Sequence, residues 1–395
     1  MRKREAEIAA ERVPELPMDL ADLSSVQSPD DLDLLCLQFE LESEPLPGED
    51  VAEKLMESFR TSGYQTLTDR AGQSQNTVFT SCILPLSDSC MALKQACIAY
   101  QASLSSATNH YTPLYMESAL SNYLSDLDNP DRLSQDVTLA TGVLLCSVSI
   151  NSLYIWTPLL KGLHGVLQTR ELLNDTHKPR LTNHLVEVIA LMDIPFFTLN
   201  RITPSLNMWK LYIQANKTEG IEETSGLPYT LITLLANLDS PDAESDLLSW
   251  PGELGDDFIH IHLWEAFKYA GVLHSRVLNA DSIPSRVKTE VLRMKVFAAI
   301  QAIISTGGFN FHETLAKAIL YPLFIAGLLA ENEQDQRLTR VGFQYLLRSG
   351  DEKVEQMLLA IVTKVWKKGK DGDAASRLMM ATETAAELNV EIHLY

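Results

Sequence analysis

The stretch YPLFIAGLLAEN, residues 321–332, decides the fold class of this protein. It is almost wholly apolar, contains one proline, and is followed by acids and amides. The apolar run extends from Leu315 to Ala330 but is interrupted by Lys317 and Pro322. A membrane-spanning helix needs about 20 consecutive apolar residues. The stretch therefore predicts a helix that is buried on most sides within a protein core, and we expect no membrane contact.

Helical patterns continue on both sides of this stretch. Within residues 354–365, apolar side chains recur at intervals of three and four residues, which places them on one face of a helix. A capping side chain precedes a proline at Thr112-Pro113, Asn129-Pro130 and Ser240-Pro241, which is typical of helix starts. Alternating strand-like runs are nearly absent, and no repeat of fixed period stands out. The sequence therefore predicts an all-α, multi-helix body over residues 51–395.

Residues 1–50 differ in composition from this body. No basic residue occurs between Arg12 and Lys54, and the segment DDLDLLCLQFELESE (30–44) alternates acids with leucine and phenylalanine. Such a composition is typical of acidic-hydrophobic segments that are disordered alone and fold on a partner. An acidic linker, or a short helix docked on the body, fits the same residues. We expect residues 1–50 to be an acidic, disordered tail or linker.

The charge of the chain argues against direct nucleic-acid binding. The 395 residues include 32 basic and 52 acidic side chains, which gives a net charge of −20. Affinity for nucleic acid rests on Lys and Arg replacing counterions at phosphates, so a surface this acidic is repelled. The basic cluster KVWKKGK (364–370) fits a solvated helix end, with nuclear import as the alternative. We therefore predict no direct nucleic-acid binding.

Sequence motifs for catalysis or metal binding are incomplete. The five cysteines include no CxxC pair, so we expect reduced thiols rather than a zinc site or a disulfide framework. His312-Glu313 begins an HExxH motif, but Ala316 stands where the second histidine is needed. His260 and His262 are two residues apart and would point away from each other on a helix. We therefore assign no catalytic residue, no metal ligand and no cofactor.

Three helical blocks occur in a recognisable order. Residues 136–167 contain a leucine-rich helix, a short polar break and then a tryptophan; residues 263–278 form a Tyr/Ala-rich helix. Residues 321–337 form the proline-interrupted block, with Tyr321 where a tryptophan is usual and Arg337 retained. In order and spacing, these blocks resemble the fungus-specific transcription factor domain that follows binuclear zinc-cluster modules. The subgroup of sterol-responsive regulators is the most similar.

The first block matches this family only in part. Trp156, Leu160 and Gly162 stand where the family has the same residues, whereas Leu159 and Leu163 replace its usual histidine and alanine. The chain also lacks the six cysteines of the family's zinc cluster. The resemblance covers most of the chain from about residue 80 onward. It implies an all-α regulatory domain of the fungal transcription factor type, without a DNA-binding zinc cluster.

The resemblance also implies a function and partners. We expect a fungal transcriptional regulatory protein that acts in the nucleus, or shuttles between cytoplasm and nucleus. Its helical domain would bind an apolar small-molecule effector or a partner, act through a DNA-binding partner protein, and form a homodimer. A link to secondary metabolism fits the same family.

Two other functions remain open at this point. The helical domain could be reused as an enzyme or carrier of secondary metabolism, such as a cyclase acting on an apolar intermediate, because such chemistry needs shape more than a motif. A pure interaction scaffold is the other. A deep cavity with convergent polar side chains would separate these readings. Our candidate ligand-binding residues are aromatic side chains on the motif helices, each of which also fits plain core packing: Trp156, Trp264, Tyr321 and Phe324.

Overall fold

The computed structural model describes residues 46–67, 77–172, 178–215, 219–253, 258–280, 286–307, 317–347, 353–368 and 373–395. The predicted acidic tail falls almost wholly in residues 1–45 and lies outside the described residues. His312 and Glu313 of the incomplete HExxH motif also lie outside them. Among the described residues, the first helix begins at Glu49.

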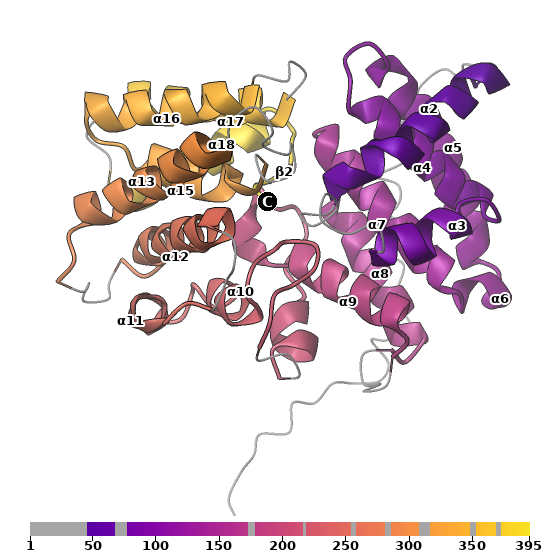
Figure 1. The fold of residues 1–395 in the computed structure, drawn as a ribbon, viewed down its shortest axis with the longest axis horizontal. Coiled ribbons are helices and arrows are strands. Elements are labelled where there is room, and N and C mark those ends of the chain that lie inside the picture. The colour runs from indigo at the N-terminus through magenta and orange to yellow at the C-terminus, as the bar shows by residue number, and fades with distance from the viewer. Residues whose placement is uncertain are drawn as a thin grey trace, which may run out of the picture.

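Helices from the N-terminal part of the chain form one group (Figure 1). They are α2 (Glu49–Thr61), η2 (Gly63–Leu67), η3 (Phe79–Ile83), α3 (Leu84–Leu86), α4 (Met91–Ser103), η4 (Asn109–Tyr111), α5 (Thr112–Leu127), α6 (Pro130–Leu133), α7 (Asp136–Asn151), α8 (Thr157–Thr169) and α9 (Arg180–Met192). α4 and α7 are at the centre, because α4 packs on α2, α5 and α7, and α7 also packs on α8 and α9.

Helices from the C-terminal part form a second group beside the first (Figure 1). They are η5 (Pro195–Phe197), η6 (Trp209–Ile213), α10 (Tyr229–Leu235), α11 (Ala243–Ser249), α12 (Phe258–Leu278), α13 (Thr289–Gly307), α15 (Leu320–Leu328), α16 (Glu333–Leu346), α17 (Lys353–Lys368) and α18 (Ala374–Glu387). α12 packs on α11, α13 and α15, and α15 also packs on α16 and α17.

One short pair of strands joins distant parts of the chain. β1 (Thr198–Leu199) pairs antiparallel with β2 (Ile392–His393), with Thr198 opposite His393. β2 lies between the two groups of helices, beside the C-terminus (Figure 1). All other regular elements of the described residues are helical, so the predicted all-α class is confirmed. The division into a tail and one helical domain stays a prediction.

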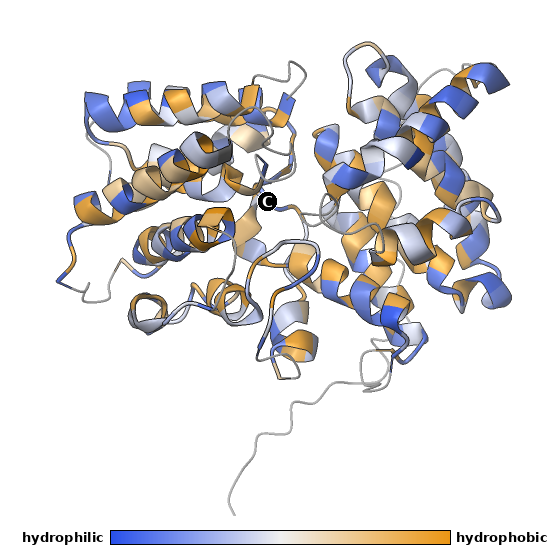
Figure 2. Ribbon diagram, in the orientation of Figure 1, coloured by the Kyte–Doolittle hydropathy of each residue, from blue (hydrophilic) through white to orange (hydrophobic). Residues whose placement is uncertain are grey.

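Residues 321–328 of the stretch that predicted the fold lie in α15, and every residue of α15 is buried. Figure 2 shows this helix in orange to pale colours, whereas α16 above it alternates between hydrophobic and hydrophilic residues. Pro322 is the third residue of α15, where a backbone N–H has no intrahelical partner, so the proline does not interrupt the helix. A Cβ on Gly327 would lie 2.4 Å from Thr339 Cγ2, so the glycine permits close packing on α16.

The predicted helix starts are confirmed in two cases of three. α6 begins at Pro130, and the Asn129 side chain accepts a hydrogen bond from the Asp131 N–H. α5 begins at Thr112, next to the proline, but the Thr112 hydroxyl makes no capping hydrogen bond, so only the position of this start is confirmed. α11 begins at Ala243 rather than at Pro241, because Ser240 Oγ instead accepts the Asp242 N–H in a turn before the helix. The helix therefore starts two residues later than predicted.

Candidate functional site

A cavity of about 200 Å³ lies where the two groups of helices meet. α7 and α9 supply walls from the N-terminal group. Lys317 and Ala318, just ahead of α15, and His393 and Tyr395 at the C-terminus also line it. A hollow of about 480 Å³ runs along α17, but it is an open surface groove beside exposed Lys367. The cavity between the two groups of helices is the less open of the two and is therefore the better candidate for a ligand site.

The wall from α7 follows from the composition of that helix. α7 is apolar on nearly all faces, so it is buried on most of its surface against α4, α5, α8 and α9. The residues that line the cavity recur at intervals of three and four, which places them on one face: Ala140, Val143, Leu144, Ser147, Ile150 and Asn151. This face is mostly apolar, and Ser147 and Asn151 are its polar side chains at the cavity.

α9 supplies the second wall in the same way. His184, Leu185, Val188, Leu191 and Met192 line the cavity and repeat with helical spacing. Aromatic rings complete the lining, from Phe79, Tyr100 and Tyr395. The Tyr100 and Thr66 hydroxyls are within 2.9 Å of each other, so these two polar groups of the lining satisfy one another. Most of the surface offered to a ligand is thus apolar or aromatic.

Three side chains of the lining carry a buried polar atom that has no hydrogen-bond partner among the described residues. They are Asn151 Nδ2, Thr224 Oγ1 and His393 Nδ1. Leaving a buried donor or acceptor unsatisfied costs about 1–3 kcal/mol, so such groups are uncommon in a packed core. Polar groups of this kind are completed by ordered water or by a ligand, and three of them face this one cavity.

His393 is uncharged at neutral pH. Burial lowers the pKa of its imidazole to about 3, and the Arg201 cation acts in the same direction, while a hydrogen bond to the Phe197 backbone opposes them. A neutral ring that bonds a backbone carbonyl does so as the donor. Because Nδ1 has no partner, Nε2–H makes that bond and Nδ1 is left as an acceptor.

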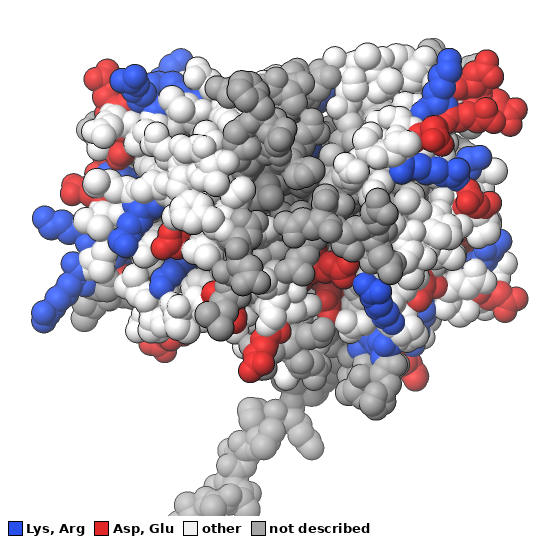
Figure 3. All heavy atoms as spheres, in the orientation of Figure 1, with Lys and Arg blue, Asp and Glu red and all other residues white. Residues whose placement is uncertain are grey.

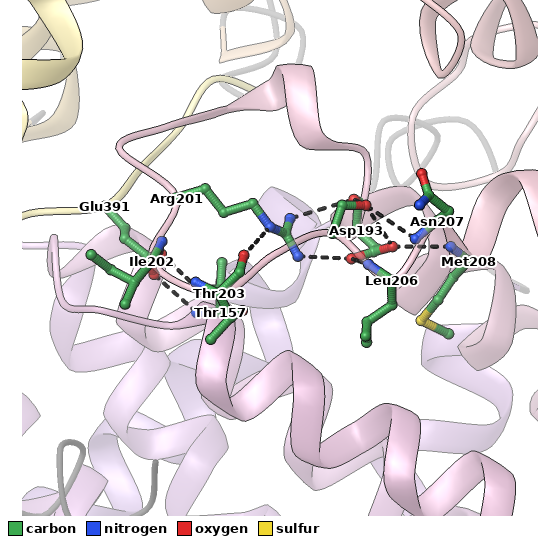
Figure 4. A network of polar contacts seen from close by, with 10 residues as sticks. Thr157, Asp193, Arg201, Ile202, Thr203, Leu206, Asn207, Met208 and Glu391 are labelled. Atoms are coloured by element: carbon green, nitrogen blue, oxygen red, sulfur yellow. Dashed lines mark hydrogen bonds and ion pairs between the residues drawn. The ribbon is translucent and has the colours of Figure 1, made fainter. Parts of the chain in front are cut away.

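The residues just before His393 are anchored by a buried carboxylate (Figure 4). Glu391 Oε2 accepts hydrogen bonds from the backbone N–H groups of Trp156 and Thr157, at 2.7 and 2.9 Å. Glu391 Oε1 accepts the Thr157 hydroxyl at 2.6 Å and also the Ile202 N–H. The Trp156 and Thr157 donors stand at the N-terminus of α8, where free N–H groups favour an anion. The chain end is thereby fixed to the N-terminal group.

A second buried carboxylate orders the segment that follows β1 (Figure 4). Asp193 pairs with Arg201, whose Nη2 lies 2.7 Å from Asp193 Oδ1. Asp193 also accepts the backbone N–H groups of Leu206 and Met208, at 3.1 and 3.0 Å. Arg201 in turn donates from Nε to the Thr203 carbonyl. The network holds Arg201 close enough to His393 to contribute to its lowered pKa.

Comparison with known protein families identifies part of the chain. Residues 239–380 match the family model described as fungal specific transcription factor domain. This range, which is similar to that family, is called the transcription factor domain below. The family predicted from the sequence is thereby confirmed over this range, which includes the second and third blocks of the resemblance. No curated protein and no solved structure matches the chain.

The first block lies outside the matched range but has the expected local structure. α7, a short break over residues 152–156 and α8 follow one another as the resemblance implies. The cavity is lined by α7 of this block and by Lys317 and Ala318 of the transcription factor domain. A ligand in the cavity would therefore contact the transcription factor domain and the helices that precede it.

The four residues predicted to contact a ligand are fully buried and are not part of the cavity lining. Trp264 Nε1 donates to the Gly226 carbonyl at 2.8 Å, and Tyr321 Oη lies 3.2 Å from His274 Nδ1. Phe324 lies in α15 within the transcription factor domain. Trp156 is nearest to the site, because its ring packs edge-on against His393 with centroids 5.3 Å apart. Direct ligand contact by these four residues stays a prediction.

Sequence reasoning missed the residues that do line the cavity. His393 and Tyr395 lie in the last stretch, EIHLY (391–395), which alternates polar and apolar residues as a short strand does. That alternation was the available signal. Asn151 and Thr224 carry no signal of their own, because single polar residues near helix ends and turns are common.

The described residues contain neither a candidate membrane span nor a cluster of metal ligands. No helix among them is long and apolar enough to cross a membrane. No group of three or more His, Cys, Asp or Glu side chains in this part of the chain could hold a metal ion. His262 Nδ1 instead lies 3.1 Å from Glu265 Oε2. His260 is buried.

Proposed function

We propose that this protein is a transcriptional regulator whose helical body binds a small effector in the cavity between α7, α9 and the C-terminus. The transcription factor domain supports the regulatory role. The observation that carries the effector site is the set of three unpartnered polar groups around one largely apolar cavity. An effector there would bridge α7 and the segment just ahead of α15, and so bias how the two groups of helices pack.

DNA would be reached through a partner protein. The chain has a net charge of −20 and no cysteine pair of CxxC spacing. On the face that Figure 3 shows, Lys and Arg side chains are interspersed with Asp and Glu instead of forming one basic patch. Phosphate recognition requires such a patch. The proposed regulator therefore supplies the response, acts in the nucleus as a homodimer, and leaves DNA contact to its partner.

The regulatory role can be tested with the full chain fused to a heterologous DNA-binding module. We expect transcription of a reporter carrying the module's site to change relative to the module alone, and to respond to an added effector. The variant Ala140→Leu, which fills the cavity from α7, should keep the basal effect and lose the response. A fusion that leaves reporter transcription unchanged in both directions would argue against a regulatory role.

The partner can be tested separately. Purified full-length chain should leave a DNA fragment from its own host unshifted in a gel, because its charge disfavours phosphate contact. Addition of the co-purifying partner should shift the same fragment, and an antibody against the chain should shift it further. A shift of the DNA fragment by the chain alone would contradict this part of the proposal.

A carrier or enzyme of secondary metabolism is the alternative that the same cavity supports. The lining contains two imidazoles, from His184 and His393. Because the pKa of His393 is lowered to about 3, its ring is a hydrogen-bond acceptor at neutral pH and a poor proton donor. This favours binding over acid-base chemistry. Conversion of a bound compound to a new product by the purified protein, followed by mass spectrometry, would favour the enzyme.

A further inference from the structure

We infer that the cavity binds a compact, uncharged ring compound that carries both a hydroxyl and a carbonyl group. This deepens the proposed effector site and rests on the proposed function for its biological role. The binding itself rests on the size of the cavity, its three unpartnered polar groups and its charge. Each of these restricts the ligand in a different way.

The volume sets the size. A dry cavity of about 150 Å³ is enough to hold benzene, and a water molecule takes about 30 Å³ in the liquid. The cavity here measures about 200 Å³, which suits one six-membered ring with small substituents. A four-ring sterol is much larger than this space. The rings of Phe79, Tyr100 and Tyr395 in the lining favour a flat ligand that can pack against aromatic faces.

The unpartnered atoms set the polar groups. Asn151 Nδ2 is a donor and requires an acceptor such as a carbonyl oxygen. His393 Nδ1 is an acceptor in the tautomer that the Phe197 backbone selects, and it requires a donor such as a hydroxyl. Thr224 Oγ1 can serve either group. A hydroxyl and a carbonyl on one ring would therefore satisfy all three.

The charged side chains around the cavity favour an uncharged ligand. Lys317 is the one charged side chain among the described residues of the lining. Burial raises the pKa of the nearby Glu355 carboxyl, and the Lys317 cation opposes that rise, so these two groups interact. Because the two groups interact, Glu355 offsets part of the Lys317 charge at the cavity. An anionic ligand would therefore gain little and would lose its hydration.

The test uses three probes of similar size with the full-length protein and isothermal titration calorimetry. 4-Hydroxyacetophenone carries both groups and no charge, 4-ethyltoluene carries neither group, and 4-hydroxybenzoate is anionic at neutral pH. We expect the first to bind at least tenfold more tightly than the other two. Equal binding of 4-ethyltoluene would overturn the role of the polar groups. If 4-hydroxybenzoate bound more tightly, or if no probe bound, the inference that the ligand is an uncharged ring compound would be wrong.

Two variants locate the binding. Thr224→Val removes one unpartnered hydroxyl of the lining and should weaken 4-hydroxyacetophenone binding about three- to tenfold, the worth of one hydrogen bond. Thr112→Val is the matched control, because Thr112 Oγ1 is also buried and unpartnered but does not line the cavity. Ala140→Leu should abolish binding. Unchanged affinity in both Thr224→Val and Ala140→Leu would place the probe elsewhere and overturn the inference.

Failure of the proposed function gives a different result. If the probe binds as expected but the reporter fusion never responds, the ligand class stands and the regulatory role fails. If the reporter responds to a host compound that lacks a hydroxyl or a carbonyl, the regulatory role stands and the ligand class fails.

Discussion

Glu391 is hydrogen-bonded to Thr157 through both of its carboxylate oxygens, although the two residues are far apart in sequence. Oε2 accepts the Thr157 backbone N–H at 2.9 Å, and Oε1 accepts its hydroxyl at 2.6 Å. The carboxylate is fully buried and also accepts two further N–H groups, from Trp156 and Ile202. It thereby fixes the position of His393, two residues later, in the cavity wall.

The first prediction concerns this carboxylate. Glu391→Gln replaces one acceptor oxygen with an amide that donates, so at least one buried N–H loses its partner whichever way the amide is turned. We expect the free energy of unfolding to fall by about 2 to 3 kcal/mol. Denaturant unfolding measures the change, with the exposed Glu383→Gln as the control that should differ little from the parent protein. If Glu391→Gln and Glu383→Gln were equally stable, the hydrogen bonds of the Glu391 carboxylate would not contribute to stability, which would contradict the prediction.

The second prediction concerns a buried ion pair between α13 and α16. Arg293 is only 1% exposed, and its Nε lies 3.0 Å from Asp335 Oδ2. Removing Asp335 leaves a buried cation with the mostly exposed Glu331 as its remaining partner at 3.5 Å. Asp335→Ala should therefore lower the free energy of unfolding by about 3 to 5 kcal/mol.

A double-mutant cycle separates this pair from general packing. Because both charges leave together, Arg293→Met combined with Asp335→Ala should cost less than the sum of the two single changes. The measurement is denaturant unfolding of all four proteins at one pH. Strictly additive losses would show that the two side chains do not depend on each other.

Much of the fold followed from residue patterns, because apolar spacing along a helix is a local property. The periodic apolar residues of α17 predicted its buried face, and Leu358, Ile361, Val362 and Val365 are all buried there. The basic cluster at the end of α17 was less well predicted. Trp366 is buried and donates to the Gly327 carbonyl at 2.8 Å, whereas Lys367 and Lys368 are exposed as expected.

The candidate site could be predicted much less well, because it depends on contacts between distant segments. Trp156 and Tyr321 were chosen as aromatic residues on motif helices, but each packs behind the lining rather than within it. The cavity instead draws on Asn151, Thr224 and His393, which come from three separate regions. Nothing local in the sequence relates these positions, since the antiparallel pairing of β1 with β2 brings His393 into place.

The third prediction concerns the close packing of α15 on α16. A Cβ on Gly327 would lie 2.4 Å from Thr339 Cγ2, which is far inside van der Waals contact. Gly327→Ala should therefore lower the free energy of unfolding by about 1 to 3 kcal/mol, despite the better helix propensity of alanine. Adding Thr339→Ser removes the clashing methyl and keeps the hydroxyl that donates to the Asp335 carbonyl. Thermal unfolding should show that the double variant recovers part of the loss.

The fourth prediction concerns acid sensitivity. Burial lowers the pKa of His274 to about 4 and that of His393 to about 3, below the ordinary value of about 6.5. Below about pH 6.5 these two histidines are protonated in the unfolded chain but not in the folded protein. The free energy of unfolding therefore falls as the pH drops from about 6.5 toward the folded-state pKa values. His274→Gln keeps a side chain that can hydrogen-bond the Tyr321 hydroxyl but does not titrate.

The comparison that checks this prediction is the loss of unfolding free energy between pH 7 and pH 5 in the two proteins. Each such histidine contributes about 1.4 kcal/mol per pH unit below its unfolded pKa, so His274→Gln should lose about 1 to 2 kcal/mol less than the parent protein. Comparing each protein with itself across pH cancels the cost of the substitution. Parallel pH profiles would show that His274 binds a proton equally well in the folded and unfolded chains, and would remove His274 as a source of acid sensitivity.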